Sequence, residues 1–155
     1  LTNIYSIYFT LNNYTQRVTF ILLLTKKKQL NMKIAIIIIR TLIGLLFLVS
    51  SLGFFLKLFP EPTTTGDFKA FQVGLVASSY LIPLAKTVEL LCGLSFVSGK
   101  YVTLANLLIL PVTVNILFIN FFLSPEGIPI ALFVFFGNLF LIFSHWQNYK
   151  SIFTA

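Results

Sequence analysis

The chain has 155 residues and carries far less charge than an ordinary soluble domain. Charged residues make up 10% and hydrophobic residues 57%, whereas soluble proteins are about 25% charged. So little charge cannot keep a compact chain dissolved in water, so the composition predicts a protein with several membrane spans. The net charge of +7 does not indicate nucleic acid as a partner, because five of the eleven basic residues lie in the first 33 positions beside apolar segments.

Cysteine and histidine are almost absent, and this excludes several kinds of site. Cys92 is the only cysteine and His145 the only histidine. One cysteine cannot form a Cys-x-x-Cys redox pair, an intramolecular disulfide or a thiolate metal cluster. The chain also has no glycine-rich phosphate loop and no nucleophile elbow. We therefore expect no metal site and no catalytic residue, and any redox chemistry would need a bound quinone or other cofactor, or a partner subunit.

The first 31 residues differ from the rest of the chain. They are rich in Asn, Thr, Tyr, Ile and Lys, and their longest apolar run, Val18–Leu24, is too short to cross a bilayer. The only methionine, Met32, precedes a lysine and a long apolar run, as expected at the natural start of a membrane protein. We therefore interpret residues 1–31 as upstream read-through or a disordered extension, and residues 32–155 as one four-span domain. The alternative is a short interfacial anchor whose lysines contact lipid headgroups.

Four apolar segments are long enough to cross a membrane as helices, and proline and glycine separate them. Pro111 falls near the middle of the third segment and predicts a kink, because it removes a backbone hydrogen bond. Between the first two spans, Phe68–Ser79 predicts a short helix that is interfacial or re-entrant. The predicted fold is all-α, a membrane four-helix bundle with this one short extra helix. The expected spans are residues 34–59, 82–97, 101–123 and 128–144.

The lysines predict how the bundle is oriented. If the N-terminus is inside, Lys33, Lys100 and Lys150 lie on the inner side. Lys57 and Lys69 then lie on the outer side, together with three acidic residues. Lysine and arginine are more frequent in cytoplasmic loops, so this distribution favours cytoplasmic placement of both termini.

Three ionisable residues, Arg40, Lys86 and Glu89, lie inside predicted spans. A charge at the centre of a span costs about 2.5–3.5 kcal/mol unless it is paired or hydrated. Counted from Lys33 and Lys100 at one membrane face, Arg40 lies about 10 Å deep and Glu89 about 16 Å deep. An arginine side chain can cover the difference, so we predict a buried Arg40–Glu89 ion pair with Lys86 on the same helix face as Glu89. The group is either a staple between two spans or the lining of a polar pocket for a headgroup, an anion or a proton.

Weaker polar signals lie in the later spans. Asn115 and Asn120 are secondary ligand candidates, and Asn138 is a weaker one, because asparagine in a span usually forms hydrogen bonds across helices. Two pairs of small residues with small-xxx-small spacing predict close helix contacts. These pairs are Gly74 with Ser78 and Ser95 with Gly99.

Four stretches follow one another in an order and spacing that match a known family. They are Arg40–Phe47, Phe71–Tyr80, Pro83–Glu89 and Pro111–Asn115. On these residues, within positions 33–150, the chain resembles the DoxX-like family of small four-helix membrane proteins. The resemblance implies a bacterial inner-membrane protein with four spans, and it places the family's characteristic arginine at Arg40 and glutamate at Glu89. Some relatives are membrane subunits of thiosulfate–quinone oxidoreductases, and others are linked to oxidative or thiol stress.

Three functions remain open on the sequence, and all three have a lipid bilayer as partner. The first is an accessory subunit linked to quinone or thiol redox metabolism or oxidative stress, working with a redox partner subunit. Arg40, Lys86 and Glu89 would then line a polar pocket in an apolar cavity that accepts a quinone ring. The second is a small transporter with an ion or proton path, which would need a homo-oligomer to build a pore. The third is a structural membrane subunit. The chain is not expected to be an enzyme alone.

Overall fold

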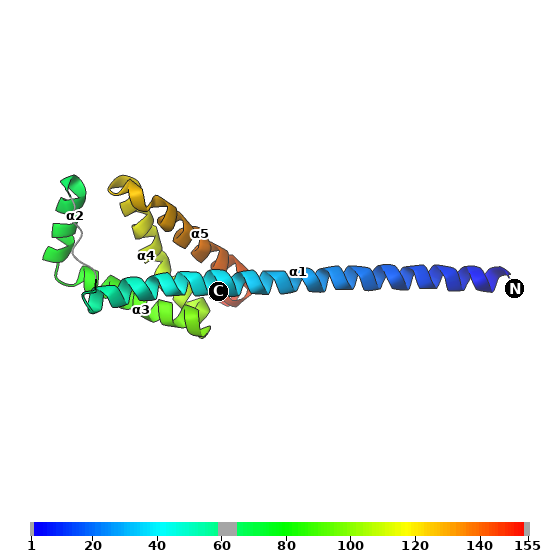
Figure 1. Cartoon of the computed structure of the whole chain (residues 1–155). Coiled ribbons are helices and arrows are strands. Elements are labelled where there is room, and N and C mark those ends of the chain that lie inside the picture. The colour runs from blue at the N-terminus through cyan, green and yellow to red at the C-terminus, as the bar shows by residue number, and fades with distance from the viewer. Residues whose placement is uncertain (1, 59–64, 154–155) are drawn as a thin grey trace. The chain divides into compact units, whose positions relative to one another are not determined.

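The computed structural model describes residues 2–58 and 65–153, with side chains at positions 16–58 and 65–150. The described residues form helices and contain no strand. They fall into two compact units, the first ending at Ile37 and the second beginning at Ile38 (Figure 1). The helix α1, Thr2–Phe55, contributes to both units. The two units are therefore described separately.

The first unit is the N-terminal part of α1. Every side chain from position 16 to position 34 is exposed, so this stretch buries no core of its own. Residues 2–31, interpreted from the sequence as read-through, a disordered extension or an interfacial anchor, lie in this helix. A helical backbone does not decide between these origins, and the boundary at Met32 stays a prediction.

The second unit contains the remaining helices, and the predicted all-α fold is confirmed. Four helices are long and apolar enough to cross a membrane: Gln16–Phe55, Leu81–Ser98, Val102–Phe122 and Pro125–Ser144. A short helix lies between the first two, as predicted. The expected end of the first span at Phe59 lies outside the described residues. The elements after α1 are α2 (Gly66–Ala77), α3 (Leu81–Ser98), α4 (Val102–Phe122), η1 (Pro125–Gly127), α5 (Ile128–Ser144) and α6 (Trp146–Phe153).

Local sequence signals explain where these helices end and begin. Gly99 stops α3 with a left-handed backbone at φ 77°, and its N–H bonds the carbonyl of Ser95. Glycine adopts this conformation without the steric cost of a Cβ. A proline in the first turn of α5 costs little, because the first N–H groups of a helix have no partner within it. Pro111 lies within α4, which continues through it.

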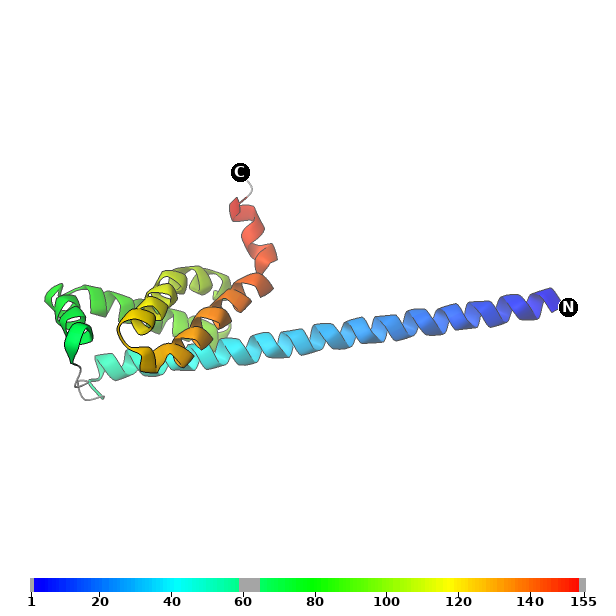
Figure 2. The same cartoon turned by 90° about the horizontal axis from the view of Figure 1, so that it is seen from above.

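The core of the second unit is small, and most large apolar side chains face outward. The helix α4 packs against both α3 and α5, and both views show α4 and α5 side by side (Figures 1 and 2). The core between the helices includes Ile43, Phe96, Ile109 and Leu141, each completely buried. Outward-facing leucines and phenylalanines cover every span. This distribution suits a lipid environment, where apolar surface carries no hydration penalty.

The closest approach between helices joins α1 and α3 at two glycines. A Cβ added to Gly44 would lie 2.8 Å from the Cβ of Phe96, and one added to Gly93 would lie 3.1 Å from the carbonyl oxygen of Gly44. Gly44 therefore has no room for a Cβ, and at Gly93 a Cβ would be tighter than almost all ordinary contacts. The predicted contact at Gly74 was wrong, because a Cβ there meets nothing within 4 Å. Gly74 lies on α2, which has no buried residue, so its spacing marks no helix interface.

Candidate functional site

Three polar side chains from α1 and α3 form a closed cluster inside the spans. The Lys86 Nζ lies 2.8 Å from the Glu89 Oε2 and donates to the Ser50 Oγ at 2.7 Å. The Ser50 hydroxyl donates to the same Glu89 oxygen at 3.0 Å. Each member therefore contacts the other two, and the hydroxyl of α1 completes an ion pair whose charges both lie on α3.

Burial and helix spacing explain why this cluster is stable. Lys86 and Glu89 are three residues apart, so they share one face of α3. The Glu89 side chain is 5% exposed and the Lys86 side chain 23% exposed. Burying a carboxylate away from water costs free energy, which a partner charge and a hydrogen-bond donor offset. Lys86 and Ser50 supply them.

The cluster retains free binding capacity on both charged residues. An ammonium group has three donors, and Lys86 uses two of them, on Ser50 and Glu89. The second oxygen of Glu89, Oε1, has no partner among the described residues. One donor on Lys86 and one acceptor on Glu89 therefore remain unused in the cluster. This arrangement can bind a group that accepts one hydrogen bond and exchanges one proton.

The predicted Arg40–Glu89 ion pair is not formed. Among the described residues the only ion pair is Lys86–Glu89, and the Arg40 guanidinium lies instead against Gly99 at the far end of α3. Glu89 precedes Gly99 by ten residues on α3, which is about 15 Å of helix. The prediction treated Lys33 and Lys100 as level, but the residue level with the end of α3 is Arg40 itself. The predicted register between α1 and α3 was therefore wrong by about seven residues, and Glu89 lies too far along α3 for Arg40 to reach.

The secondary candidates Asn115 and Asn120 do not join the cluster. Asn115 is exposed. Asn120 donates to the carbonyl of Ile116 at 2.8 Å, within its own helix. Its Oδ1 packs so closely on Gly127 that a Cβ there could not fit. Both asparagines thus lie on α4 without a hydrogen bond to Ser50, Lys86 or Glu89, and Asn120 helps to seat the turn before α5.

A second polar group, which the sequence did not reveal in full, joins α4 and α5. Asn138 and Asn106 are both completely buried. The Asn138 Nδ2 donates to the Asn106 Oδ1 at 3.2 Å and to its carbonyl at 3.3 Å. This confirms the expectation that Asn138 hydrogen-bonds across helices. Asn106 was missed, because a single amide in an apolar run has no distinguishing pattern.

The C-terminal helix α6 is held at the start of α4 by two hydrogen bonds to Thr103. The hydroxyl of Tyr149, a side chain 1% exposed, donates to the Thr103 carbonyl at 2.9 Å. The Asn148 Nδ2 donates to the Thr103 Oγ1 at 3.2 Å. Burial raises the pKa of Tyr149, so its hydroxyl keeps the proton that it donates. Tyr149 therefore belongs to the core of the bundle.

Comparison with known proteins identifies the kind of chain that carries these groups. The family model DoxX matches residues 35–121, more than half of the chain. Comparison with curated proteins and with solved structures gave no match. The matched range contains Arg40, Ser50, Lys86 and Glu89, so the polar cluster lies wholly within the family region. In the part of the chain that the structure describes, no three or more histidine, cysteine or acidic side chains are grouped to hold a metal ion.

Proposed function

Because the chain belongs to the DoxX family, we propose that it is a membrane subunit that binds a quinone at the Ser50–Lys86–Glu89 cluster. The observation that carries the proposal is a charged pair, almost closed to water, that keeps one free donor and one free acceptor within the spans. Quinones dissolve in the apolar part of the bilayer, where this cluster is the polar group best suited to them.

The residues of the cluster fit a quinone headgroup by their chemistry. A quinone supplies two carbonyl oxygens and accepts electrons and protons when it is reduced. The free N–H of Lys86 would donate to one carbonyl, and the Glu89 Oε1 would hold or release a proton next to it. Ser50 keeps the lysine and the carboxylate in place through its two hydrogen bonds. The apolar side chains of the spans would surround the ring.

The electrons would come from a partner subunit. The chain has a single cysteine, which is buried, and the cluster consists of an amine, a carboxylate and a hydroxyl. None of these three groups changes its oxidation state in normal protein chemistry. We therefore infer an accessory role, linked to quinone or thiol redox metabolism, in which this subunit binds the quinone and the partner transfers electrons.

We also infer a bacterial inner-membrane location with both termini cytoplasmic. The basic residues of the bundle support this orientation. Lys100 lies at the turn between α3 and α4, and Lys150 lies on α6, which is held at the start of α4. The acidic Asp67 and Glu126 lie on α2 and η1, in connections on the other side of the spans. Placing the more basic end in the cytoplasm agrees with the positive-inside rule.

The test is to purify the full chain from native membranes and to quantify bound quinone and copurifying proteins. We expect about one quinone for each folded chain and a redox protein in the same fraction. Glu89→Gln should lower the bound quinone at least tenfold, equivalent to about 1.4 kcal/mol of binding free energy. Glu126→Gln is the matched control, because Glu126 is an exposed carboxylate in η1, and it should leave the quinone unchanged.

Two outcomes would contradict the proposal. The first is a well-folded native protein without quinone or redox partner. The second is equal quinone in the Glu89→Gln and Glu126→Gln proteins. Proton flux through vesicles containing the native protein, abolished by Glu89→Gln, would favour the transporter instead. A Glu89→Gln protein that is less stable than the native protein but carries the same amount of quinone per folded chain would favour the structural role.

A further inference from the structure

Arg40 is a cation without a partner charge in the described part of the chain. The only ion pair there joins Lys86 to Glu89. The other described carboxylates, Asp67 and Glu126, lie on α2 and η1, in connections at the opposite end of the spans. The protein therefore keeps a permanent positive charge at the end of α3 without neutralising it from its described residues. An arginine cannot lose its charge by losing a proton.

The Arg40 guanidinium packs against Gly99, at the turn that ends α3. A Cβ at Gly99 would lie 2.9 Å from the Arg40 Nη2, 3.0 Å from Nη1 and 3.2 Å from Cζ. Only a glycine leaves room for the group, and the left-handed backbone at φ 77° also favours glycine there. Two constraints therefore favour glycine at this position, and the Nη1–Nη2 end of the guanidinium faces the turn that ends α3.

The hydrogen-bonding groups of Arg40 are not satisfied by the protein. The Nε is buried and has no hydrogen-bond partner. Nη1 and Nη2 form no hydrogen bond or ion pair with any described residue either, and they are not among the buried unpartnered atoms. Nη1 and Nη2 are therefore the donors of the group that are not fully buried. A charged donor without an acceptor costs free energy that a ligand oxygen would recover.

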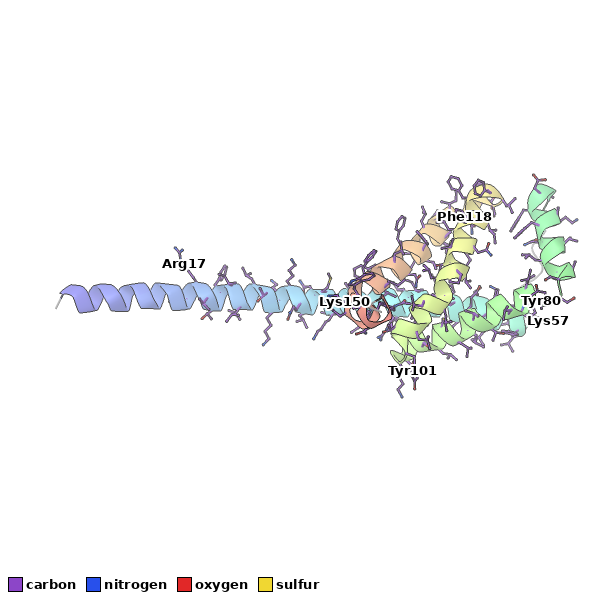
Figure 3. All side chains as sticks on the ribbon, turned by 180° about the vertical axis from the view of Figure 1, so that it is seen from behind. Arg17, Lys57, Tyr80, Tyr101, Phe118 and Lys150 are labelled. Atoms are coloured by element: carbon purple, nitrogen blue, oxygen red, sulfur yellow. The ribbon has the colours of Figure 1, made fainter. Side chains whose placement is uncertain are left out.

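The depth of Arg40 in the membrane indicates which acceptors can reach it. The 18 residues of α3 cover about 27 Å, close to the 30 Å or so of hydrocarbon in a bilayer. A helix of this length that crosses the bilayer has its ends near the two surfaces of the hydrocarbon core, within reach of the lipid headgroups for a long side chain. Tyr101, 79% exposed, and the exposed Lys100 follow directly. Figure 3 shows Tyr80 and Tyr101 at opposite ends of α3, as expected of aromatic residues at the two interfaces.

From this arrangement we propose that Arg40 is the centre of an oxyanion site that binds a phosphate group at the end of α3. The N–H groups of Nη1 and Nη2 can donate to phosphate oxygens, and Lys100 adds a second positive charge. The phosphate belongs either to an anionic phospholipid or to a free anion, which share this chemistry. The site is independent of the quinone proposal, because Glu89 lies about 15 Å away along α3.

The experiment titrates phosphatidylglycerol, and separately phosphatidylcholine, into the full-length protein in neutral detergent and counts bound lipids by native mass spectrometry. We expect at least tenfold tighter binding of phosphatidylglycerol. Arg40→Gln should remove this preference, and Arg40→Lys should recover part of it, because a lysine keeps the charge but loses the paired donors. Lys57→Gln is the matched control, since Lys57 is an exposed cation near the other end of α3 (Figure 3), and it should bind like the native protein.

A second arm of the experiment identifies the source of the phosphate. Millimolar inorganic phosphate that displaces phosphatidylglycerol from the native protein would assign the site to a free anion. Lack of displacement would assign it to the lipid headgroup.

The proposal is overturned if Arg40→Gln, with an unfolding temperature like that of Lys57→Gln, keeps the native preference for phosphatidylglycerol. Equal binding of the two lipids by the native protein, without any effect of phosphate, also overturns it. If Arg40→Gln does not fold, the test rests on Arg40→Lys alone. A preference for phosphatidylglycerol equal to that of the native protein would then overturn the proposal.

Discussion

Two neighbouring serines on α1 have different roles although both hydroxyls are hydrogen-bonded. Ser50 reaches across to α3, where it accepts from Lys86 and donates to Glu89. Ser51 is completely buried, and its hydroxyl bonds only carbonyls of its own helix, at Phe47 and Leu48. The Ser50 hydroxyl therefore stabilises a contact between helices, whereas the Ser51 hydroxyl only satisfies its own hydrogen-bonding capacity within α1.

We expect Ser50→Ala to lower the free energy of unfolding by about 1–2 kcal/mol, since it removes two hydrogen bonds to charged groups. Ser51→Ala is the control, and it should cost less than about 1 kcal/mol because no charged group loses a partner. Unfolding of the two proteins in the same detergent, followed by circular dichroism, measures the difference. An equal loss in both proteins would show that the Ser50 bonds to α3 contribute nothing.

At this scale the sequence predicts charged residues better than neutral polar ones. Lys86 and Glu89 are conspicuous in an apolar segment, and their spacing places them on one helix face. Ser50 and Asn106 lie in apolar runs where serine and asparagine are common enough to pass unnoticed. Their importance comes from the helix opposite them, and a single chain segment does not contain that information.

The contact between α1 and α3 depends on backbone surfaces at Gly44 and Gly93. Small residues let two helices approach closely, and in a membrane such packing replaces much of the hydrophobic driving force. Gly44 lies between Arg40 and Ser50 along α1, and Gly93 lies between Glu89 and Gly99 along α3. The close approach therefore determines how the polar groups on the two helices meet.

Gly44→Ala should destabilise the bundle by about 1–3 kcal/mol through overpacking, because its Cβ would lie 2.8 Å from the Cβ of Phe96. That carbon is attached directly to the α3 backbone and cannot rotate away. Gly74→Ala is the matched control on α2, where the Cβ meets nothing within 4 Å. Alanine is the better helix former by about 1 kcal/mol, so this control should unfold no earlier than the native protein. Thermal unfolding in detergent compares them, and equal behaviour would contradict the close contact.

The ends of the helices were predictable, but the register between them was not. Proline and glycine mark the ends, as Gly99 does for α3 and Pro129 for the first turn of α5. Register depends on which side chains fit against each other. The Arg40–Glu89 prediction failed there, because it assumed that the lysines flanking two spans are level. The contact of Arg40 with Gly99 corrects that assumption.

For the molecule as a whole, composition predicted the class of protein, and the apolar segments predicted the number of spans. A chain with 10% charged residues has few ways to fold other than as membrane helices. The compact unit beginning at Ile38 holds all the buried side chains given for the described residues. The preceding helical stretch exposes every described side chain up to position 34. The stability of the bundle should therefore not depend on that stretch.

A chain that begins at Met32 should unfold within about 0.5 kcal/mol of the full chain, as expected when only exposed side chains are lost. The comparison needs both proteins in one detergent, with equal amounts of folded protein at the start. A loss of several kcal/mol on truncation would show that residues 1–31 support the bundle. N-terminal sequencing of the native protein would separately locate the start of translation.

The burial of Cys92 has a practical consequence. Its side chain is 2% exposed, and its sulfur lies 3.5 Å from the carbonyl oxygen of Ala105, between α3 and α4. Maleimide reagents added from water meet no accessible thiol in the described chain, because Cys92 is the only cysteine. The native protein should therefore not react with the label, and Cys92 need not be removed before site-directed labelling. A cysteine introduced at Tyr101 or at Lys57 would be the only target, and labelling in sealed vesicles would report which end of the bundle faces the cytoplasm.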